Sequence, residues 1–383
     1  MASQSTIQFP SIKKTALNAL LSPFITGPLL LYIQRNPHIL DKVPWFPDLT
    51  LAPPFRLPFN LRNSITLHAD PPLRALKKLF WIGLALHVNR LLNRLALNYW
   101  HLTRQGEPWD FAAEGREVIV ITGGCSGFGR EMVKLFAAKT RARIVVLDIQ
   151  DLPADMKDIP RLSYHKIDLS DFDSIRTTVT EFLKTTTPTV LINNAGIAQA
   201  HTILNTSDAF LDKIFRINVL SHFSLLRLIL PKMLAAKKGH IVTLASMASY
   251  TGQPNLGDYT ATKAAVLGLH ESLVQELQHR YENGHCIQAS IIHPMWARTP
   301  LVASWESELD RTKRTVLSAE DVASRVVAQV LSGRSGSVFV PENMVTGTAF
   351  RVVPDWLALL LRASIQSATN NEGRGSQGTA GGA

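Results

Sequence analysis

The sequence predicts an α/β protein built on a doubly wound parallel sheet of seven strands, with a helical extension at its N-terminus. From Arg116 onward, short runs rich in Val, Ile and Leu alternate with stretches whose apolar residues recur at helical spacing. A glycine-rich turn follows the first of these runs. Alternating strands and helices form a parallel sheet with right-handed crossovers and helices on both faces. Ligands of such sheets bind beyond the carboxyl ends of the strands, so we expect the functional site there.

Seven runs are predicted as strands because they are short, apolar and bounded by turn residues. They span 117–121, 144–147, 162–167, 189–192, 240–245, 287–292 and 337–340. Helical apolar spacing predicts helices over 130–138, 174–184, 208–233, 259–281 and 319–331. Together these elements place the main domain at 111–341.

The chain ahead of the main domain begins with an apolar stretch. Residues 16–33 carry no charge and lie between Lys14 and Arg35. The length of this stretch is about the minimum for a helix that crosses a bilayer. Pro23 and Pro28 leave a bent span, a re-entrant segment and an interfacial helix as alternatives. We therefore expect a membrane segment over 1–35, followed by a proline-rich extended connector over 36–72.

A second apolar helical stretch is predicted over 73–110. Its uncharged core, 79–89, is too short to span a membrane and is bracketed by Lys and Arg. Trp81 and Trp100 suit the headgroup level, so we expect an amphipathic helix in the membrane interface, with a helix docked on the main domain as the alternative. After the main domain, 342–366 is predicted to be an apolar segment that caps a pocket or touches membrane, and 367–383 to be a disordered tail.

Composition and charge indicate a folded protein that meets membranes rather than nucleic acid. The chain is 46% hydrophobic and 18% charged, with a net charge of +10. Residues 1–116 hold 13 Lys and Arg against 6 Asp and Glu, so most of the excess flanks apolar runs. This arrangement favours an anionic membrane surface, with ordinary solvated charge as the alternative. Only two cysteines occur, and no cluster has metal-ligand spacing, so we expect a reducing compartment and no metal.

The glycine-rich turn has the composition of a phosphate cradle. Gly123, Gly127 and Gly129 lie between the first strand and the first helix of the main domain. Such a turn lets the backbone approach a pyrophosphate and places a helix N-terminus behind its charge. Asp148 ends the second strand, where a carboxylate accepts hydrogen bonds from ribose hydroxyls and repels a 2′-phosphate, which favours NAD over NADP. Asp168, after the third strand, is placed to meet the adenine or to cap a turn.

Three further residues carry the chemistry of a proton transfer. Tyr259 and Lys263 lie four residues apart on a predicted helix and hence on one face. An ammonium beside a phenol lowers the tyrosine pKa toward the physiological range, as a general acid or base for hydride chemistry requires. Ser246 closes the fifth strand, and its hydroxyl can hold a substrate oxygen. The small residues Asn194, Ala195 and Gly196 after the fourth strand allow close approach of a cofactor.

With these motifs in place, the sequence resembles the short-chain dehydrogenase/reductase family, in its N-terminally anchored form similar to retinol and 17-beta-hydroxysteroid dehydrogenases. The resemblance covers 116–341 and implies a Rossmann-type fold. It implies Asn218 as a fourth catalytic residue beside Ser246, Tyr259 and Lys263, steadying a water next to Lys263. It also implies a possible homodimer. The cofactor contacts that it implies are Gly123, Ser126, Gly127, Phe128, Gly129, Asp148, Asp168, Asn194, Ala195, Gly196, Tyr259, Lys263, Pro294 and Thr299.

One motif departs from the family pattern. After the sixth strand the family usually has Pro-Gly followed by a threonine, whereas here Pro294 is followed by Met295 and Trp296. The missing glycine leaves the local backbone open, and Thr299 keeps its expected role near the nicotinamide.

These observations predict an NAD(H)-dependent oxidoreductase of a lipophilic alcohol and its carbonyl, with NADP the less favoured cofactor. A retinoid, a steroid or a long-chain lipid is the expected substrate, and the endoplasmic reticulum or lipid droplet the expected location. Two alternatives stay open: a membrane-associated scaffold that binds a dinucleotide without turnover, and a soluble dehydrogenase of a small polar alcohol.

Overall fold

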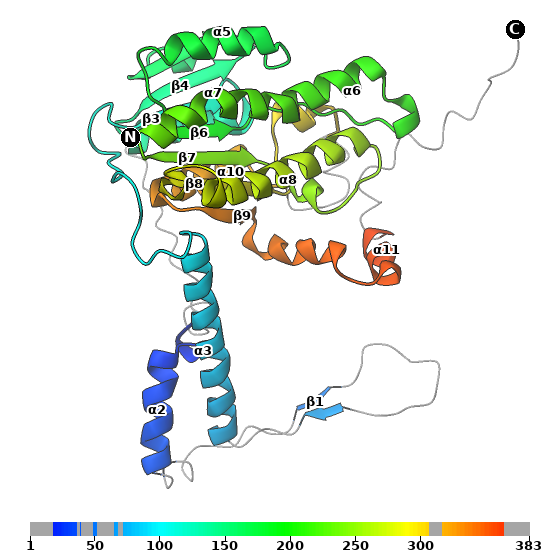
Figure 1. Ribbon diagram of the computed structural model, residues 1–383. Coiled ribbons are helices and arrows are strands. Elements are labelled where there is room, and N and C mark those ends of the chain that lie inside the picture. Colours follow the sequence, from blue (N-terminus) through cyan, green and yellow to red (C-terminus); the bar gives the residue numbers. More distant parts are fainter. Residues whose placement is uncertain are drawn as a thin grey trace, which may run out of the picture. The chain divides into compact units, whose positions relative to one another are not determined.

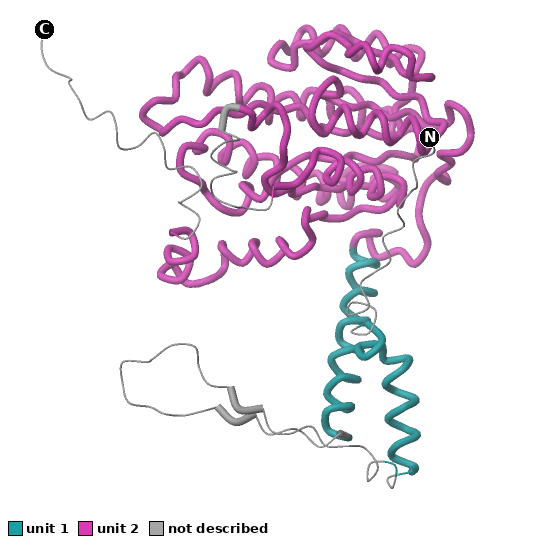
Figure 2. Tube along the Cα trace, turned by 180° about the vertical axis from the view of Figure 1, so that it is seen from behind, with its two compact units in different colours: residues 1–96 teal, residues 97–383 magenta. Residues whose placement is uncertain are grey.

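The computed structural model describes residues 18–36, 39, 49–51, 65–67, 72–305 and 316–363. Most of the predicted proline-rich connector and the whole of the predicted tail lie outside these residues, as do the first 17 residues of the predicted membrane segment. The chain divides into two compact units, Met1–Ala96 and Leu97–Ala383 (Figure 2).

A seven-stranded parallel sheet forms the centre of the second unit (Figure 1). Its strands are β3 (Val118–Thr122), β4 (Arg143–Asp148), β5 (Leu162–Lys166), β6 (Val190–Asn193), β7 (Gly239–Leu244), β8 (Ile287–Pro294) and β9 (Gly336–Val340). They are ordered β5-β4-β3-β6-β7-β8-β9. From β3 to β5 the strands are added toward one edge of the sheet, and from β6 to β9 toward the other edge. The boundary between β3 and β6 is therefore the switch point of the strand order, where such sheets bind ligands. The predicted Rossmann-type fold is confirmed.

Helices cover both faces of the sheet, because strands that are apolar along their whole length, such as β3, must be buried on both sides. On one face, Ile119 and Ile121 pack with α4 (Gly127–Lys139) and α10 (Ala319–Ser332). On the other face, Val118 and Val120 belong to the cluster that contains residues of α5 (Phe172–Phe182), α7 (Ser221–Ala235) and α8 (Gly257–His279). Both layers consist of buried apolar side chains, and this packing fixes the sheet and the strand ends that carry the site.

The helix expected over 208–233 is not a single α-helix. It consists of α6 (Asp208–Phe215), the π-helix η4 (Arg216–Leu220) and α7. Among the described residues, only Asp208–Ala235 is long and apolar enough to cross a membrane, and half of its most apolar window is buried in the protein. We assign it to the core because α7 packs against the sheet.

Short helices and a C-terminal helix complete the second unit. The 3₁₀ helices are η2 (Ala154–Met156), η3 (Ile203–Asn205), η5 (Met247–Ser249), η6 (Gly284–Cys286), η7 (Pro300–Trp305) and η8 (Glu342–Arg351). The last described helix is α11 (Asp355–Ala363), which buries Ala358 and exposes most of its other apolar side chains.

A segment without regular structure, 97–116, packs at the amino ends of the strands. The Tyr99 hydroxyl donates to the carbonyl oxygen of Ile287, at the start of β8, over 3.1 Å. The Glu107 amide donates to the carbonyl oxygen of Lys237, just before β7, over 3.1 Å. Because of these contacts the segment belongs to the second unit, and the unit boundary falls after Ala96 rather than at residue 110.

A buried ion pair joins the end of this segment to the sheet. Lys238 Nζ lies 2.5 Å from Glu117 Oε1, and the side chains are 8% and 0% exposed. The same ammonium donates to the Pro108 carbonyl oxygen and lies 5.0 Å from the ring centroid of Trp109. A buried charge must be paired, so each member depends on the other.

The first unit contains two packed helices, α2 (Pro23–Arg35) and α3 (Pro72–Ala96). Gly83 permits their close approach, because a Cβ atom there would lie 2.2 Å from the carbonyl oxygen of Leu21. The rings of Phe24 and His87 meet edge to face with their centroids 5.9 Å apart. The unit also has two short antiparallel strands, β1 (Leu49–Leu51) and β2 (Ile65–Leu67), which lie within the predicted connector.

Candidate active site

The glycine turn between β3 and α4 adopts a backbone that side chains would block. Gly123 and Gly127 have φ angles of +66° and +50°, in the left-handed region that favours glycine. A Cβ atom on Gly129 would lie 1.9 Å from the carbonyl oxygen of Gly123. The Asn194 side chain supports the turn by donating to the carbonyl oxygens of Thr122 and Gly123 over 2.9 and 3.1 Å. The turn is therefore held open by glycine and pinned to the end of β6.

A pocket extends from this turn along the carboxyl ends of β3, β4 and β6, and we call it the glycine-turn pocket. Ten of the predicted cofactor contacts line it: Gly123, Ser126, Gly127, Phe128, Asp148, Asp168, Asn194, Ala195, Gly196 and Thr299. The first helical amides of α4 begin at Gly127, so a pyrophosphate in the turn would meet the helix N-terminus. The residues fit a dinucleotide, with the turn at its phosphates and Asp148 at its ribose.

Asp148 is fixed by backbone donors. Its carboxylate oxygens accept hydrogen bonds from the amides of Cys125 and Gln150 over 2.8 and 2.9 Å, and the residue is 6% exposed. Each oxygen keeps acceptor capacity for a ribose hydroxyl. Asp168 lines the same pocket while its Oδ1 accepts from the amide and the hydroxyl of Ser170 over 2.8 and 2.7 Å. Asp168 therefore lies at the pocket and also caps the turn at Ser170, and its contact with an adenine stays a prediction.

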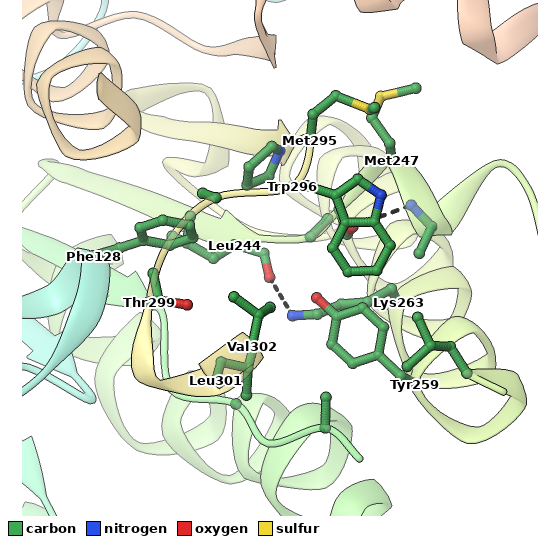
Figure 3. A pocket seen from close by; sticks show the side chains of 18 of the residues that line it. Phe128, Leu244, Met247, Tyr259, Lys263, Met295, Trp296, Thr299, Leu301 and Val302 are labelled. Carbon is green, nitrogen blue, oxygen red and sulfur yellow. Dashed lines mark hydrogen bonds between the residues drawn. The ribbon is translucent and has the colours of Figure 1, made fainter. Parts of the chain in front are cut away.

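A second pocket, the tyrosine pocket, lies beside Ser246, Tyr259 and Lys263, all three of which line it. In Figure 3 the phenol of Tyr259 and the side chain of Lys263 end close to each other. Lys263 Nζ donates to the carbonyl oxygen of Leu244 over 2.8 Å and lies 5.5 Å from the centroid of the Tyr259 ring. The Ser246 hydroxyl, which accepts from the Ala248 amide over 3.1 Å, also makes a hydrogen bond with Tyr259. The structure thus brings the three predicted residues together.

Asn218 lies behind these residues on the π-helix. Its side chain exchanges two hydrogen bonds with the backbone of Ile197, of 2.9 and 3.0 Å, and donates to the Thr262 hydroxyl over 3.1 Å. Gly196 separates it from Lys263: a Cβ atom there would lie 3.3 Å from Asn218 Oδ1 and 3.8 Å from Lys263 Nζ. Asn218 therefore fixes the chain after β6 within reach of the lysine.

The electrostatics of the tyrosine pocket differ from the sequence prediction. Burial raises the pKa of Tyr259 to about 12, and the hydrogen bond with Ser246 opposes this shift. Burial lowers the pKa of Lys263 to about 8. The sequence predicted a tyrosine pKa lowered toward the physiological range, whereas burial of the phenol shifts this pKa in the opposite direction. The Tyr259 hydroxyl therefore keeps its proton at neutral pH.

The chain after β8 stays paired with β9 although the glycine of the family pattern is absent. The Met295 amide donates to the carbonyl oxygen of Val340 over 2.8 Å, so the chain continues along β9 without a glycine. Pro294 lines the tyrosine pocket, and Thr299 lines both pockets. A Cβ atom on Gly127 would lie 3.5 Å from the Thr299 side chain, which places that threonine against the glycine turn.

Some residues of the site were not predicted from the sequence. Thr122 Oγ1 accepts from the amides of Asn194 and Ala195 over 2.9 and 3.0 Å, and its position directly before Gly123 was the available signal. The apolar walls of the tyrosine pocket had no such signal, because they come from separate loops: Met247, Leu256, Trp296, Leu301 and Val302.

Hydride transfer between a dinucleotide and a C–OH group needs two adjoining sites, one for the nucleotide and one with a proton donor for the oxygen. The two pockets adjoin, since Asn194, Gly196 and Thr299 line both. Fold and site together define an NAD(P)-dependent oxidoreductase that acts on CH–OH groups. Residues 117–310 match the family model described as short chain dehydrogenase. The chain belongs to this family.

Similar proteins include a fungal and a human dehydrogenase. Dehydrogenase RED2 of Cochliobolus heterostrophus is 35% identical over 204 residues, which are 52% of this chain and 73% of that protein. The 17-beta-hydroxysteroid dehydrogenase 13 of Homo sapiens is 29% identical over 233 residues, 59% of this chain and 75% of that protein. The solved structure of a 4-hydroxyisoleucine dehydrogenase complexed with NADH is 27% identical, with a TM-score of 0.53 over 58% of this chain and 96% of that one.

Proposed function

We propose that the protein interconverts a lipophilic alcohol, such as a retinoid, a steroid or a long-chain lipid, and its carbonyl with NAD(H). The bound nicotinamide supplies or accepts the hydride. Tyr259 donates the proton to the carbonyl oxygen or takes it from the alcohol, and Ser246 holds that oxygen by a hydrogen bond. In reduction Lys263 returns a proton to the phenolate that Tyr259 has become, and in oxidation it carries the proton away from the phenol. Asn218 keeps the adjoining chain in place.

The observation that carries the proposal is the lining of the tyrosine pocket. The pocket contains about 860 Å³ of empty volume, part of which is open to solvent. Among the described residues that line it, Lys263 is the one with a charge, and its ammonium is turned to the Leu244 carbonyl. The substrate end is walled by Met247, Trp296 and Val302 (Figure 3). An anionic or highly polar substrate would lose its hydration here without a counter-charge, whereas an apolar chain or ring gains by burial.

A substrate panel tests this proposal. The purified protein is incubated with NAD and with retinol, estradiol, a long-chain secondary alcohol, gluconate and 4-hydroxyisoleucine, and NADH fluorescence is followed. We expect turnover of at least one lipophilic alcohol with a kcat/KM at least about tenfold above that of both polar ones, a difference of about 1.4 kcal/mol. Turnover confined to the polar alcohols would overturn the proposed substrate class.

The preference for NAD is tested by removing the charge of Asp148. In Asp148→Asn the amide keeps one acceptor oxygen, so one of the two backbone donors loses its partner, and the side chain no longer repels a 2′-phosphate. We expect the ratio of kcat/KM with NADH to that with NADPH to fall at least about tenfold. Asp151→Asn is the matched control, because Asp151 is 86% exposed and pairs with Lys166. An unchanged ratio in Asp148→Asn would show that another group selects the cofactor.

The pH dependence follows from the neighbouring Tyr259 and Lys263. Since the pKa of Lys263 is lowered to about 8 and that of Tyr259 is raised, the pair loses its first proton near pH 8. Oxidation needs the deprotonated pair and reduction the protonated one. We expect kcat/KM for oxidation to rise about tenfold from pH 6 to 7 and to level off above pH 9, and that for reduction to fall above pH 8. Steady-state rates from pH 6 to 10 measure this, and an oxidation profile that is flat over the range contradicts it.

We further propose that the protein attaches to an anionic membrane surface. Two separate surfaces support this. In the first unit, α2 and α3 leave large apolar side chains 44–79% exposed: Phe24, Ile25, Leu29, Leu31, Tyr32, Trp81, Ile82, Val88, Leu91 and Leu92. In the second unit, Trp356, Leu359 and Leu360 of α11 are 63–65% exposed. Such surfaces on helices with basic neighbours bind the interface of a bilayer.

Vesicle flotation tests the attachment. We expect the full chain to float with vesicles of phosphatidylcholine and phosphatidylserine, and less with phosphatidylcholine alone. The triple variant Trp356→Ser/Leu359→Ser/Leu360→Ser should float less at the same lipid concentration. Leu204→Ser is the control, since Leu204 is 94% exposed but lies on η3. A full chain that stays with the soluble fraction on both vesicles would refute the proposal.

A further inference from the structure

His293, the residue before Pro294 in β8, is a buried histidine for which the proposed reaction has no role. It is fully buried at 0% exposure, and its Nδ1 lies 3.2 Å from the carbonyl oxygen of Ser246. A carbonyl oxygen only accepts, so Nδ1 carries the hydrogen and donates it. Nε2 is then an acceptor, and it has no partner among the described residues. Burial, which lowers the pKa of His293 to about 4, keeps the ring neutral.

Two aromatic rings hold the imidazole in this orientation. His293 is in register with Phe339 on the neighbouring strand β9, and their rings stack at 4.9 Å with an interplanar angle of 20°. Tyr250, which follows η5, lies against the ring at 5.0 Å and 55°. A fully buried ring that packs against two aromatic neighbours cannot turn freely, so the donor at Nδ1 remains directed at the Ser246 carbonyl.

The Ser246 peptide unit is the point where β7 gives way to η5. Its carbonyl oxygen accepts from the Ser249 amide over 3.0 Å as well as from His293. The hydroxyl on the other side of the residue accepts from the Ala248 amide and meets Tyr259. The bonds from Ser249 and Ala248 are local to the turn, whereas the bond from His293 ties the turn to the adjoining strand. The backbone tie to β8 ends at the preceding residue, where the Ala245 amide donates to the Ile292 carbonyl oxygen over 2.9 Å, so the His293 bond extends the attachment to the serine itself.

We propose that His293 is a positioning residue for Ser246: its Nδ1–H anchors the serine carbonyl to β8 and thereby aims the serine hydroxyl at the substrate oxygen. This rests on the proposed function of the same site, in which Ser246 binds that oxygen. Small displacements of a group that binds the reacting oxygen cost rate rather than substrate affinity, because the bond matters most in the transition state.

Three substitutions separate positioning from packing. His293→Phe keeps a flat ring between Phe339 and Tyr250 but removes the donor. His293→Asn places an amide nitrogen near the site of Nδ1, and His293→Gln places one near Nε2. With an alcohol that the wild type oxidises, we expect kcat to fall about tenfold or more in His293→Phe and His293→Gln, with the KM for NAD unchanged. His293→Asn should recover kcat to within about threefold of the wild type. Equal kcat values in the Asn and Gln variants would overturn the proposal, even if the Phe variant failed to fold.

A double-mutant cycle with Ser246→Ala distinguishes this proposal from the function on which it rests. If His293 acts through the serine, His293→Phe should cause no further loss of kcat in the Ser246→Ala background. A full additional loss there would mean that His293 acts elsewhere, and the positioning role would be refuted. If Ser246→Ala alone leaves kcat unchanged, the proposed role of the serine fails instead.

Discussion

Replacing Tyr259 by phenylalanine is expected to lower kcat by about 10²–10⁴-fold in both directions, because a positioned proton donor contributes a factor of this size. The ring remains, so the packing of the tyrosine pocket and the binding of NADH should change little. Only the hydroxyl, which meets the Ser246 hydroxyl, is lost. Stopped-flow or steady-state NADH fluorescence measures the loss, and NADH titration measures the retained binding.

Tyr281→Phe is the matched control for this experiment. Tyr281 is 38% exposed and does not line the tyrosine pocket. The loss of the Tyr281 hydroxyl should leave kcat within about twofold of the wild type, since a substitution on the surface and outside the site changes stability and activity little. If Tyr259→Phe also kept kcat within a few-fold, another residue would have to supply the proton and the proposed mechanism would fail.

Replacing Lys238 by methionine is expected to reduce the free energy of unfolding by about 3–5 kcal/mol, because it leaves the carboxylate of Glu117 buried without a counter-charge. The same change removes the hydrogen bond to the Pro108 carbonyl and the contact with Trp109. Urea denaturation at pH 7, followed by tryptophan fluorescence, measures the shift of the midpoint.

The ion pair of Lys184 and Glu181 provides the control, with side chains 63% and 71% exposed. Lys184→Met should cost no more than about 1 kcal/mol because solvent screens such a pair. The double variant Glu117→Leu/Lys238→Met should recover part of the loss, since no buried charge is then left alone. A Lys238→Met protein as stable as the Lys184→Met one would contradict the account of the buried pair.

The sheet could be predicted closely because each of its strands is a separate apolar run with its own turn. The run predicted over 144–147, for example, is the core of β4, and the run over 337–340 is all but the first residue of β9. The α-helix expected over 208–233 could not be predicted in its true form, since the π-helix depends on the bonds between Asn218 and Ile197, which are distant in sequence.

Within the site, the sequence predicted which residues meet but not their protonation. Ser246, Tyr259 and Lys263 come together because strand ends and one helical face converge in any sheet of this topology. The direction of the Tyr259 pKa was predicted wrongly, since burial is a property of the whole fold and outweighs a neighbour four residues away. The role of His293 could not be predicted either, because it also depends on the whole fold. The pairing of β8 with β9 places Phe339 beside its ring, and the turn after β7 brings the Ser246 carbonyl oxygen to its Nδ1.

The π-helix between α6 and α7 also determines which lengths of chain this region tolerates. A π-turn takes up one residue more than an α-turn, so the two helices are out of phase by about 100° relative to an uninterrupted α-helix. Deleting a single codon between Arg216 and Leu220 would let the helix close into regular α form. Either Asn218 would then turn away from Ile197, or the buried face of α7 with Leu225 would turn away from the sheet. A one-residue, in-frame deletion here would therefore act as a null allele, although the same deletion in a surface loop would be tolerated.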